Sequence, residues 1–154
     1  MAPSGVSAVL YRRDEGISRD YAPQSRFCHD MAFYLFTRDT VRPTGTGGAQ
    51  PAELVSFRTD IESTRDQASL PAANLDVSLL GNHMTNAESL LEIVDRYDSI
   101  TTDRLHVAIA GLLRGKKVTL HPCSYPKISG IYEASLAKIP GVDLRFVAAP
   151  PDHR

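Results

Sequence analysis

The chain has 154 residues, a length that fits one domain, or one domain with a fragment of a second. Hydrophobic residues make up 42% of it and charged residues 23%, which is the composition of a folded protein rather than a disordered one. The formal net charge of −1 excludes a broad basic surface for nucleic acid or anionic membranes, so any anion site is expected to be local.

The first residues lack the basic start and long apolar core of a secretion signal, and no apolar run reaches the roughly 18 residues that a membrane-spanning helix needs. Cys28 and Cys123 have no CxxC partner, which favours reduced structural thiols over a disulfide framework. The spacing of His29, His83 and His121 is not that of a zinc site. We therefore expect a cytoplasmic protein without a metal or a transmembrane segment.

A Pro- and Gly-rich connector over residues 40–52 divides the chain. Before it, residues 7–11 predict a buried strand and residues 30–36 a second apolar element. Residues 1–39 are too few to form a core of their own, so this piece must pack against something else.

After the connector, short apolar runs alternate with helical patterns. Strands are predicted at residues 54–57, 75–80, 99–102, 117–121 and 144–148. Helices are predicted from a capping box of Thr85 and Glu88, over residues 103–115 ended by Gly115, and over residues 129–139 with Ser129 as a cap. This alternation predicts an α/β fold: a doubly wound, Rossmann-like parallel sheet over residues 53–154 with helices on both faces.

In such sheets, ligands bind beyond the carboxyl ends of the strands, where helix N-termini present free N–H groups. The rule selects Arg58, Asp60 and Glu62 after one strand, Thr102, Asp103, Arg104 and His106 after another, and Lys127 after a third. Three cations at one sheet edge would suit a ligand with two or three negative charges.

Arg104 is the most informative of these residues. Thr102 or Asp103 can cap the helix, which would place Arg104 in the first turn, where a positive charge opposes the helix dipole unless it faces an anion. The alternative is an arginine that extends into solvent. His106 lies two residues on and is either a proton-transfer group or an ordinary surface or core histidine.

Residues 99–136 resemble the C-terminal signature of the polysaccharide pyruvyl transferase family: a strand, T/S-x-R-L-H-x-x-I, a glycine-terminated helix, a strand and a downstream lysine. The positions that match are Thr102, Arg104, Leu105, His106, Ile109, Gly115 and Lys127. Residues 54–63 resemble the R-x-D-x-E strand of the family's second lobe, and residues 9–15 and 29–35 resemble the closing elements of its first lobe.

The resemblance implies one lobe of a GT-B-like fold with a remnant of the other, and an enzyme that moves the pyruvyl group of phosphoenolpyruvate onto a sugar as a ketal. It implies that Arg104 and Arg58 hold the donor's phosphate and carboxylate, with Asp60, Thr102 and Lys127 as further binding residues. It implies that His106 is the general acid or base. The acceptor would be an exopolysaccharide or cell-wall glycan, or a lipid-linked saccharide, and no cofactor is needed.

The chain matches only the last half or so of a typical family member, so a separate N-terminal lobe or a homo-oligomer would have to complete the cleft. Two alternatives stay open. One is a noncatalytic carbohydrate- or partner-binding remnant, and the other is a GT-B glycosyltransferase with a nucleotide-sugar donor.

Overall fold

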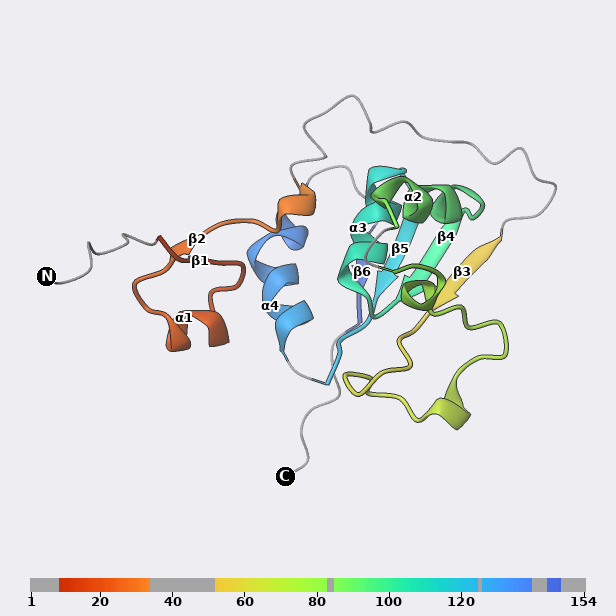
Figure 1. Ribbon diagram of the computed structural model, residues 1–154, viewed down its shortest axis with the longest axis horizontal. Helices are drawn as coiled ribbons and strands as arrows, with labels where there is room; N and C mark the ends of the chain where they lie inside the picture. Colours follow the sequence, from red (N-terminus) through yellow and green to blue (C-terminus); the bar gives the residue numbers. More distant parts are fainter. Residues whose placement is uncertain (1–8, 34–51, 83–84, 125, 140–143, 148–154) are drawn as a thin grey trace, which may run out of the picture.

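The structure is a computed structural model and describes residues 9–33, 52–82, 85–124, 126–139 and 144–147. Its centre is a parallel sheet of four strands in the order β3-β4-β5-β6 (Figure 1). The strands are β3 (Glu53–Ser56), β4 (Ser99–Thr102), β5 (Lys117–Leu120) and β6 (Leu144–Phe146). The strands predicted at 54–57, 99–102, 117–121 and 144–148 are thereby confirmed within a residue or two, as is the α/β class with a parallel sheet.

One helix lies between each pair of neighbouring strands: α2 (Ala87–Asp95), α3 (Leu105–Leu113) and α4 (Lys127–Ala134). Because the strand order follows the chain order, right-handed crossovers place all three helices on the same face of the sheet. In β3, β4 and β5 the side chains on that face are buried, and those on the opposite face, among them Glu53, Thr101 and Lys117, are at least partly exposed. The expectation that helices cover both faces is therefore not met by the described residues.

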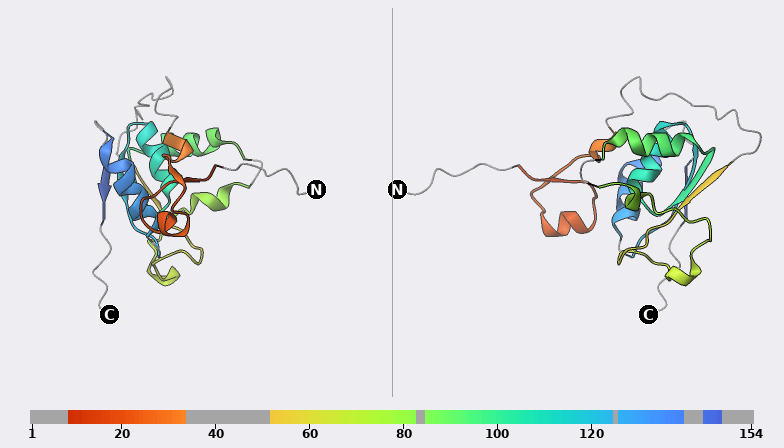
Figure 2. Two further views of the ribbon diagram at one scale, coloured as in Figure 1. Left: turned by 90° about the vertical axis from the view of Figure 1, so that its left-hand side faces the viewer. Right: turned by 45° about the vertical axis from the view of Figure 1, so that its right-hand side comes forward.

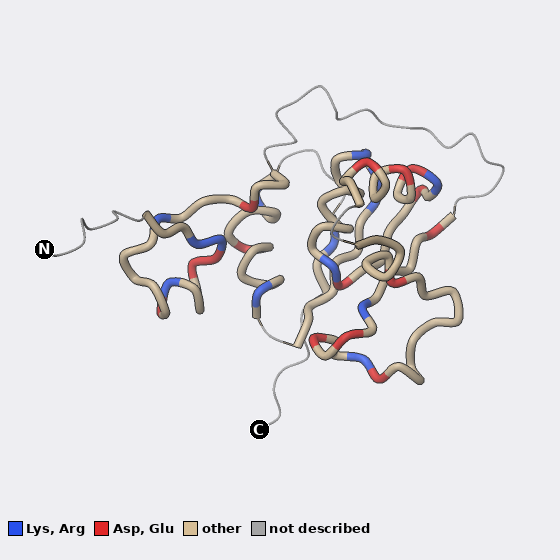
Figure 3. Tube along the Cα trace, viewed as in Figure 1, with Lys and Arg blue, Asp and Glu red and all other residues tan. Residues whose placement is uncertain are grey.

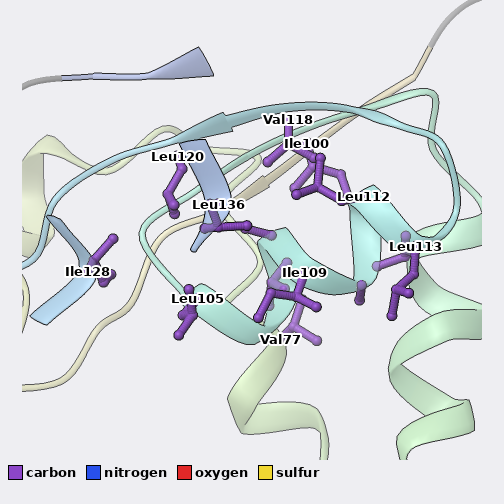
Figure 4. Close-up of a cluster of buried hydrophobic side chains, with 14 of the residues drawn as sticks. Val77, Ile100, Leu105, Ile109, Leu112, Leu113, Val118, Leu120, Ile128 and Leu136 are labelled. Atoms are coloured by element: carbon purple, nitrogen blue, oxygen red, sulfur yellow. The ribbon is translucent and has the colours of Figure 1, made fainter. Parts of the chain in front are cut away.

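Helix α3 is the centre of the core, since eight of its residues are buried. It approaches the sheet closely because Gly111 has no side chain: a Cβ there would lie 2.5 Å from Ile100 Cδ1 and 2.9 Å from Val118 Cγ2. Figure 4 shows the apolar side chains of α3 between the sheet and the surrounding elements. The last helical residue is Leu113 and Arg114 is the C-cap, so the predicted glycine, Gly115, directly follows the cap; its φ of 67° is the left-handed conformation that glycine accommodates without strain.

Within residues 75–134, several predicted features differ from the structure. Residues 75–80 are not a strand: Val77–Leu80 form a 3-10 helix, η3, capped by Asp76, whose carboxylate accepts a hydrogen bond from the Ser78 N–H. Helix α2 is capped by Asn86, which accepts from the Ser89 N–H, so the proposed capping box is wrong. Helix α4 begins at Lys127, which places Ser129 inside the helix instead of at its cap.

Residues 9–33 form a small unit beside α4 (Figures 1 and 2). In this unit, β1 (Tyr11–Arg12) pairs in parallel with β2 (Arg26–Phe27), and α1 (Ile17–Tyr21) connects them. The buried strand predicted at 7–11 is wrong where the structure describes it, because Val9, Leu10 and Tyr11 are each more than half exposed. A contact of 2.8 Å between His29 Nδ1 and Ser135 Oγ joins the unit to the end of α4.

Of the predicted apolar element at 30–36, residues 31–33 form one turn of 3-10 helix and the rest lies outside the described ranges. Residues 40–51 of the predicted connector also lie outside them. Within the described ranges, no helix has the length and apolarity needed to cross a membrane.

Candidate functional site

A cavity of about 430 Å³ lies beyond the carboxyl ends of β3 and β4. Six of the residues selected from the sequence line it, the carboxylates Glu62 and Asp103 and the basic residues Arg58, Arg104, His106 and Lys127. Arg58 follows β3, Arg104 and His106 lie at the start of α3, and Lys127 is the first residue of α4. The fold thus brings together four chemically active side chains that three different strand-to-helix connections supply.

The charges around the sheet are mixed in sign, as Figure 3 shows along the chain trace. Arg58 forms ion pairs with two carboxylates of its own loop, through Nε to Asp60 Oδ1 at 2.9 Å and through Nη2 to Glu62. Arg104 Nη2 lies 3.2 Å from Asp60 Oδ2. One small carboxylate therefore contacts both guanidinium groups, and it is 45% exposed.

Arg104 is also held by a buried carboxylate. Its Nε and Nη2 donate to the two oxygens of Asp76 at 2.7 Å each, and the Asp76 side chain is only 2% exposed. Burial raises the pKa of Asp76, but hydrogen bonds from Arg104, Ser78 and Thr59 outweigh it and lower that pKa to about 2. The sequence interpretation needs correction here: the chain itself supplies an anion for Arg104, which lies at the N-cap of α3, one residue before the first turn.

Thr102 and Asp103 are buried and join the loops that follow β3 and β4. Thr102 Oγ1 donates to the Ser56 carbonyl at 2.7 Å and accepts from the Arg104 N–H at 3.0 Å. Asp103 Oδ1 accepts from the Arg58 N–H at 2.8 Å, and burial raises the pKa of this carboxyl even though Arg58 opposes the rise. Because Thr102 is fully buried and does not line the cavity, it positions Arg104 and is not placed to contact a ligand.

The imidazole of His106 is 65% exposed, and its Nε2 lies 3.6 Å from Asp30 Oδ1. Asp30 is almost fully buried, forms an ion pair with Arg13, and accepts a hydrogen bond from the Ala32 N–H. Burial raises the pKa of Asp30, but the Ala32 and Arg13 hydrogen bonds and the charges of His106 and Arg13 lower it overall. His106 thus borders the cavity with a buried carboxylate beside its ring.

Sequence reasoning missed Asp30, Asp76 and Arg13 as members of the site. A signal for Arg13 was present in the sequence, because it follows an apolar run. The other site residues were selected by the same rule, that ligands bind just beyond the ends of strands. Among the described residues, no group of three or more His, Cys, Asp or Glu side chains could hold a metal ion.

Comparison with known proteins gives one informative match. It is a solved structure, described as a functional uncharacterized protein from Klebsiella pneumoniae subsp. pneumoniae NTUH-K2044, with 28% sequence identity and a TM-score of 0.67. The match covers 92% of this chain and 55% of that chain, so this chain spans little more than half the length of its structural relative. No family model matches the chain, and no curated protein matches it significantly. The match supports the α/β fold.

Proposed function

We propose that the protein is the donor-binding lobe of a polysaccharide pyruvyl transferase with a GT-B-like fold. The observation that carries the proposal is the convergence of Arg58, Arg104, His106 and Lys127, which the family resemblance selects, on one cavity at the carboxyl edge of the sheet. A cytoplasmic location and a glycan or lipid-linked saccharide acceptor belong to the same proposal.

The donor, phosphoenolpyruvate, is a small molecule that carries a phosphate and a carboxylate on the same carbon atom. The shared contact with Asp60 supports its binding, because Arg58 and Arg104 are already close enough to hold one small anion between them. Arg13 and Lys127, on the wall of the same cavity, supply further positive charge for the second anionic group. The cavity volume of about 430 Å³ lies in the usual range for small-molecule sites.

Ketal formation needs one proton added to the donor and two removed from the acceptor. A proton adds to the methylene carbon, which becomes the methyl group, and a sugar hydroxyl oxygen bonds to the adjacent carbon and releases its proton. The bond from that carbon to the phosphate oxygen then breaks, phosphate leaves with the electron pair and takes up a proton, and a second hydroxyl adds and loses its own. His106, which lies beside Asp30 and lines the cavity, is the group that transfers these protons, and the arginines stabilise the departing phosphate.

One observation favours a noncatalytic binding module instead. The two arginines are already paired with carboxylates of the chain, Arg104 with the buried Asp76 and Arg58 with Asp60 and Glu62. Such pairs also serve structure alone, since a buried charge requires a partner whether or not a ligand binds.

Ligand-induced stabilisation separates these functions. A ligand that binds only the native state at 100 times its Kd raises the unfolding free energy by about 2.7 kcal/mol, which appears as a higher melting temperature. We expect phosphoenolpyruvate to stabilise the protein and Arg58→Gln to remove the effect, whereas UDP-glucose and GDP-mannose leave the melting temperature unchanged. Stabilisation by a nucleotide sugar alone would favour a glycosyltransferase, and no stabilisation by any of the three would favour the noncatalytic module.

A further inference from the structure

A second cavity, of about 610 Å³, lies between the N-terminal unit and helix α4. Its walls are residues 13–18 on one side and α4 with the following turn on the other, and Figure 1 shows these two parts of the chain facing each other. The walls meet closely at Gly130, where an added Cβ would lie 3.1 Å from Asp14 Cβ. Its lining includes residues that do not line the first cavity, among them Ser18, Pro126, Ser129, Ile131, Glu133, Ala134 and Lys138.

The two cavities adjoin, because Arg13 and Lys127 line both. Arg13 also forms the ion pair with Asp30, the carboxylate that lies against His106. A molecule that fills the second cavity would therefore end beside the side chains that border the first cavity. This is the geometry that a two-substrate reaction needs, since the two reacting molecules must meet at their reacting atoms.

The lining of the second cavity is suited to a neutral, polyhydroxylated molecule. It offers hydroxyl groups on Ser18 and Ser129, a carboxylate on Glu133 and an ammonium group on Lys138, so it contains both donors and acceptors for sugar hydroxyls. Ile17 and Ile131 add apolar surface for the carbon-bound hydrogens of a sugar ring. Because charges of both signs line it, the cavity has no overall preference for a strongly charged ligand.

We propose that the second cavity binds the acceptor saccharide, with the hydroxyl pair that receives the pyruvyl group directed toward Arg13 and Lys127. The proposal rests on the pyruvyl transferase function and extends it by assigning a site to the second substrate. The volume of the second cavity lies within the usual range for small-molecule sites, which leaves room for a pyranose unit and part of its neighbour.

The test is an amide chemical-shift titration of the isotopically labelled full chain. The probes are methyl β-D-galactopyranoside, methyl β-D-mannopyranoside and methyl β-D-glucopyranoside, each with and without phosphoenolpyruvate. At least one glycoside is expected to shift the amide signals of Gly16, Ser18 and Gly130, and phosphoenolpyruvate those of Arg58 and Arg104. If none of the glycosides moves the first set while phosphoenolpyruvate moves the second, the acceptor site is refuted and the donor site survives. If phosphoenolpyruvate moves neither arginine signal, the proposed function itself fails.

A matched pair of variants controls for fold. Ala134→Leu adds an isobutyl group to the wall of the second cavity, whereas Ala137→Leu makes the same change at an exposed position that does not line it. Ala134→Leu should weaken glycoside binding about tenfold because it occupies the space of the ligand, while Ala137→Leu should leave it unchanged. Equal affinity in both variants would overturn the proposal. So would a wild-type dimer that Ala134→Leu converts to a monomer, because the cavity would then be an interface between two copies of the chain.

Discussion

Arg58 and Arg104 share one carboxylate, that of Asp60, although they follow two different strands. The parallel register of β3 and β4 causes this, since Ser56 pairs with Thr102 and the segments that follow these two strands leave the sheet side by side. Asp60 is 45% exposed and Asp76 only 2%, so the two anions on Arg104 have different roles. Asp76 fixes the guanidinium of Arg104 in place, whereas Asp60 is the exposed partner that both arginines share.

Replacing Asp60 by asparagine should tighten phosphoenolpyruvate binding about two- to fivefold. An exposed ion pair contributes at most about 1 kcal/mol, and a ligand that no longer competes with Asp60 gains that amount. Isothermal titration calorimetry measures the change, and Glu92→Gln, an exposed neutralisation on α2, is the control for net charge. Weaker binding in Asp60→Asn would instead show that Asp60 contributes to donor binding, as the sequence resemblance implied.

Replacing Asp76 by asparagine should lower the unfolding free energy by about 3 kcal/mol at neutral pH, because the partly buried Arg104 loses its charged partner. The pKa of Asp76 is lowered from 3.8 to about 2, so its contribution is present above pH 4 and is lost as the pH falls from about 4 to 2. Wild-type stability should therefore decline through this window more steeply than that of the variant. Urea denaturation at several pH values tests this, with Asp66→Asn, an exposed cap of the 3-10 helix Gln67–Ser69, as control. A variant as stable as the wild type at pH 7 would show that the pair contributes nothing to the fold.

The sequence predicted the sheet well because its strands are compact apolar runs whose polar neighbours mark their ends. It failed at residues 75–80, where the alternation resembles a strand but Leu79 and Leu80 are exposed. There Asp76 is bound by Arg104 and by Thr59, and its carboxylate caps the 3-10 helix. The contacts with Arg104 and Thr59 come from other segments, so the local pattern carries no sign of them.

In the candidate site, too, the sequence predicts what depends on local pattern and strand order but not the contacts between distant segments. The rule that ligands bind beyond the carboxyl ends of parallel strands predicted which loops to examine, because it depends only on strand order. The carboxylates that pair with Arg104 and His106 come from residues 76 and 30, which only the folded chain brings near them. The helix-dipole argument placed Arg104 in the first turn facing a ligand, whereas Arg104 is the N-cap residue of α3 and its guanidinium pairs with the buried carboxylate of Asp76, a pairing that structure alone can require.

Replacing Gly111 by alanine should lower the unfolding free energy by about 1 to 3 kcal/mol, although the same change on an exposed helix surface is stabilising. The new Cβ would overlap Ile100 and Val118, which are almost completely buried and have little room to move. Chemical denaturation measures the loss. Gly16→Ala is the matched control, because a Cβ there would meet only Asp14 Oδ1 at an ordinary 3.7 Å. Equal effects of the two substitutions would contradict the direct packing of α3 on the sheet.

His106 is expected to act on turnover and not on donor binding. Its ring is mostly exposed and has the Asp30 carboxylate behind it, so it can gain and lose a proton at the cavity without disturbing the core. A proton-transfer group contributes mainly in the transition state, so His106→Gln should lower kcat by about a hundredfold or more while the Kd for phosphoenolpyruvate changes little. In the assembled, active enzyme, phosphate release in the presence of an acceptor saccharide gives kcat, and calorimetry gives the Kd. Asp30→Asn, which keeps the shape of the side chain but removes its charge, should also lower kcat, by a smaller factor.

A parallel loss of donor affinity and turnover in His106→Gln would make the histidine a binding residue. An unchanged kcat would make it a surface residue that happens to lie beside a buried carboxylate.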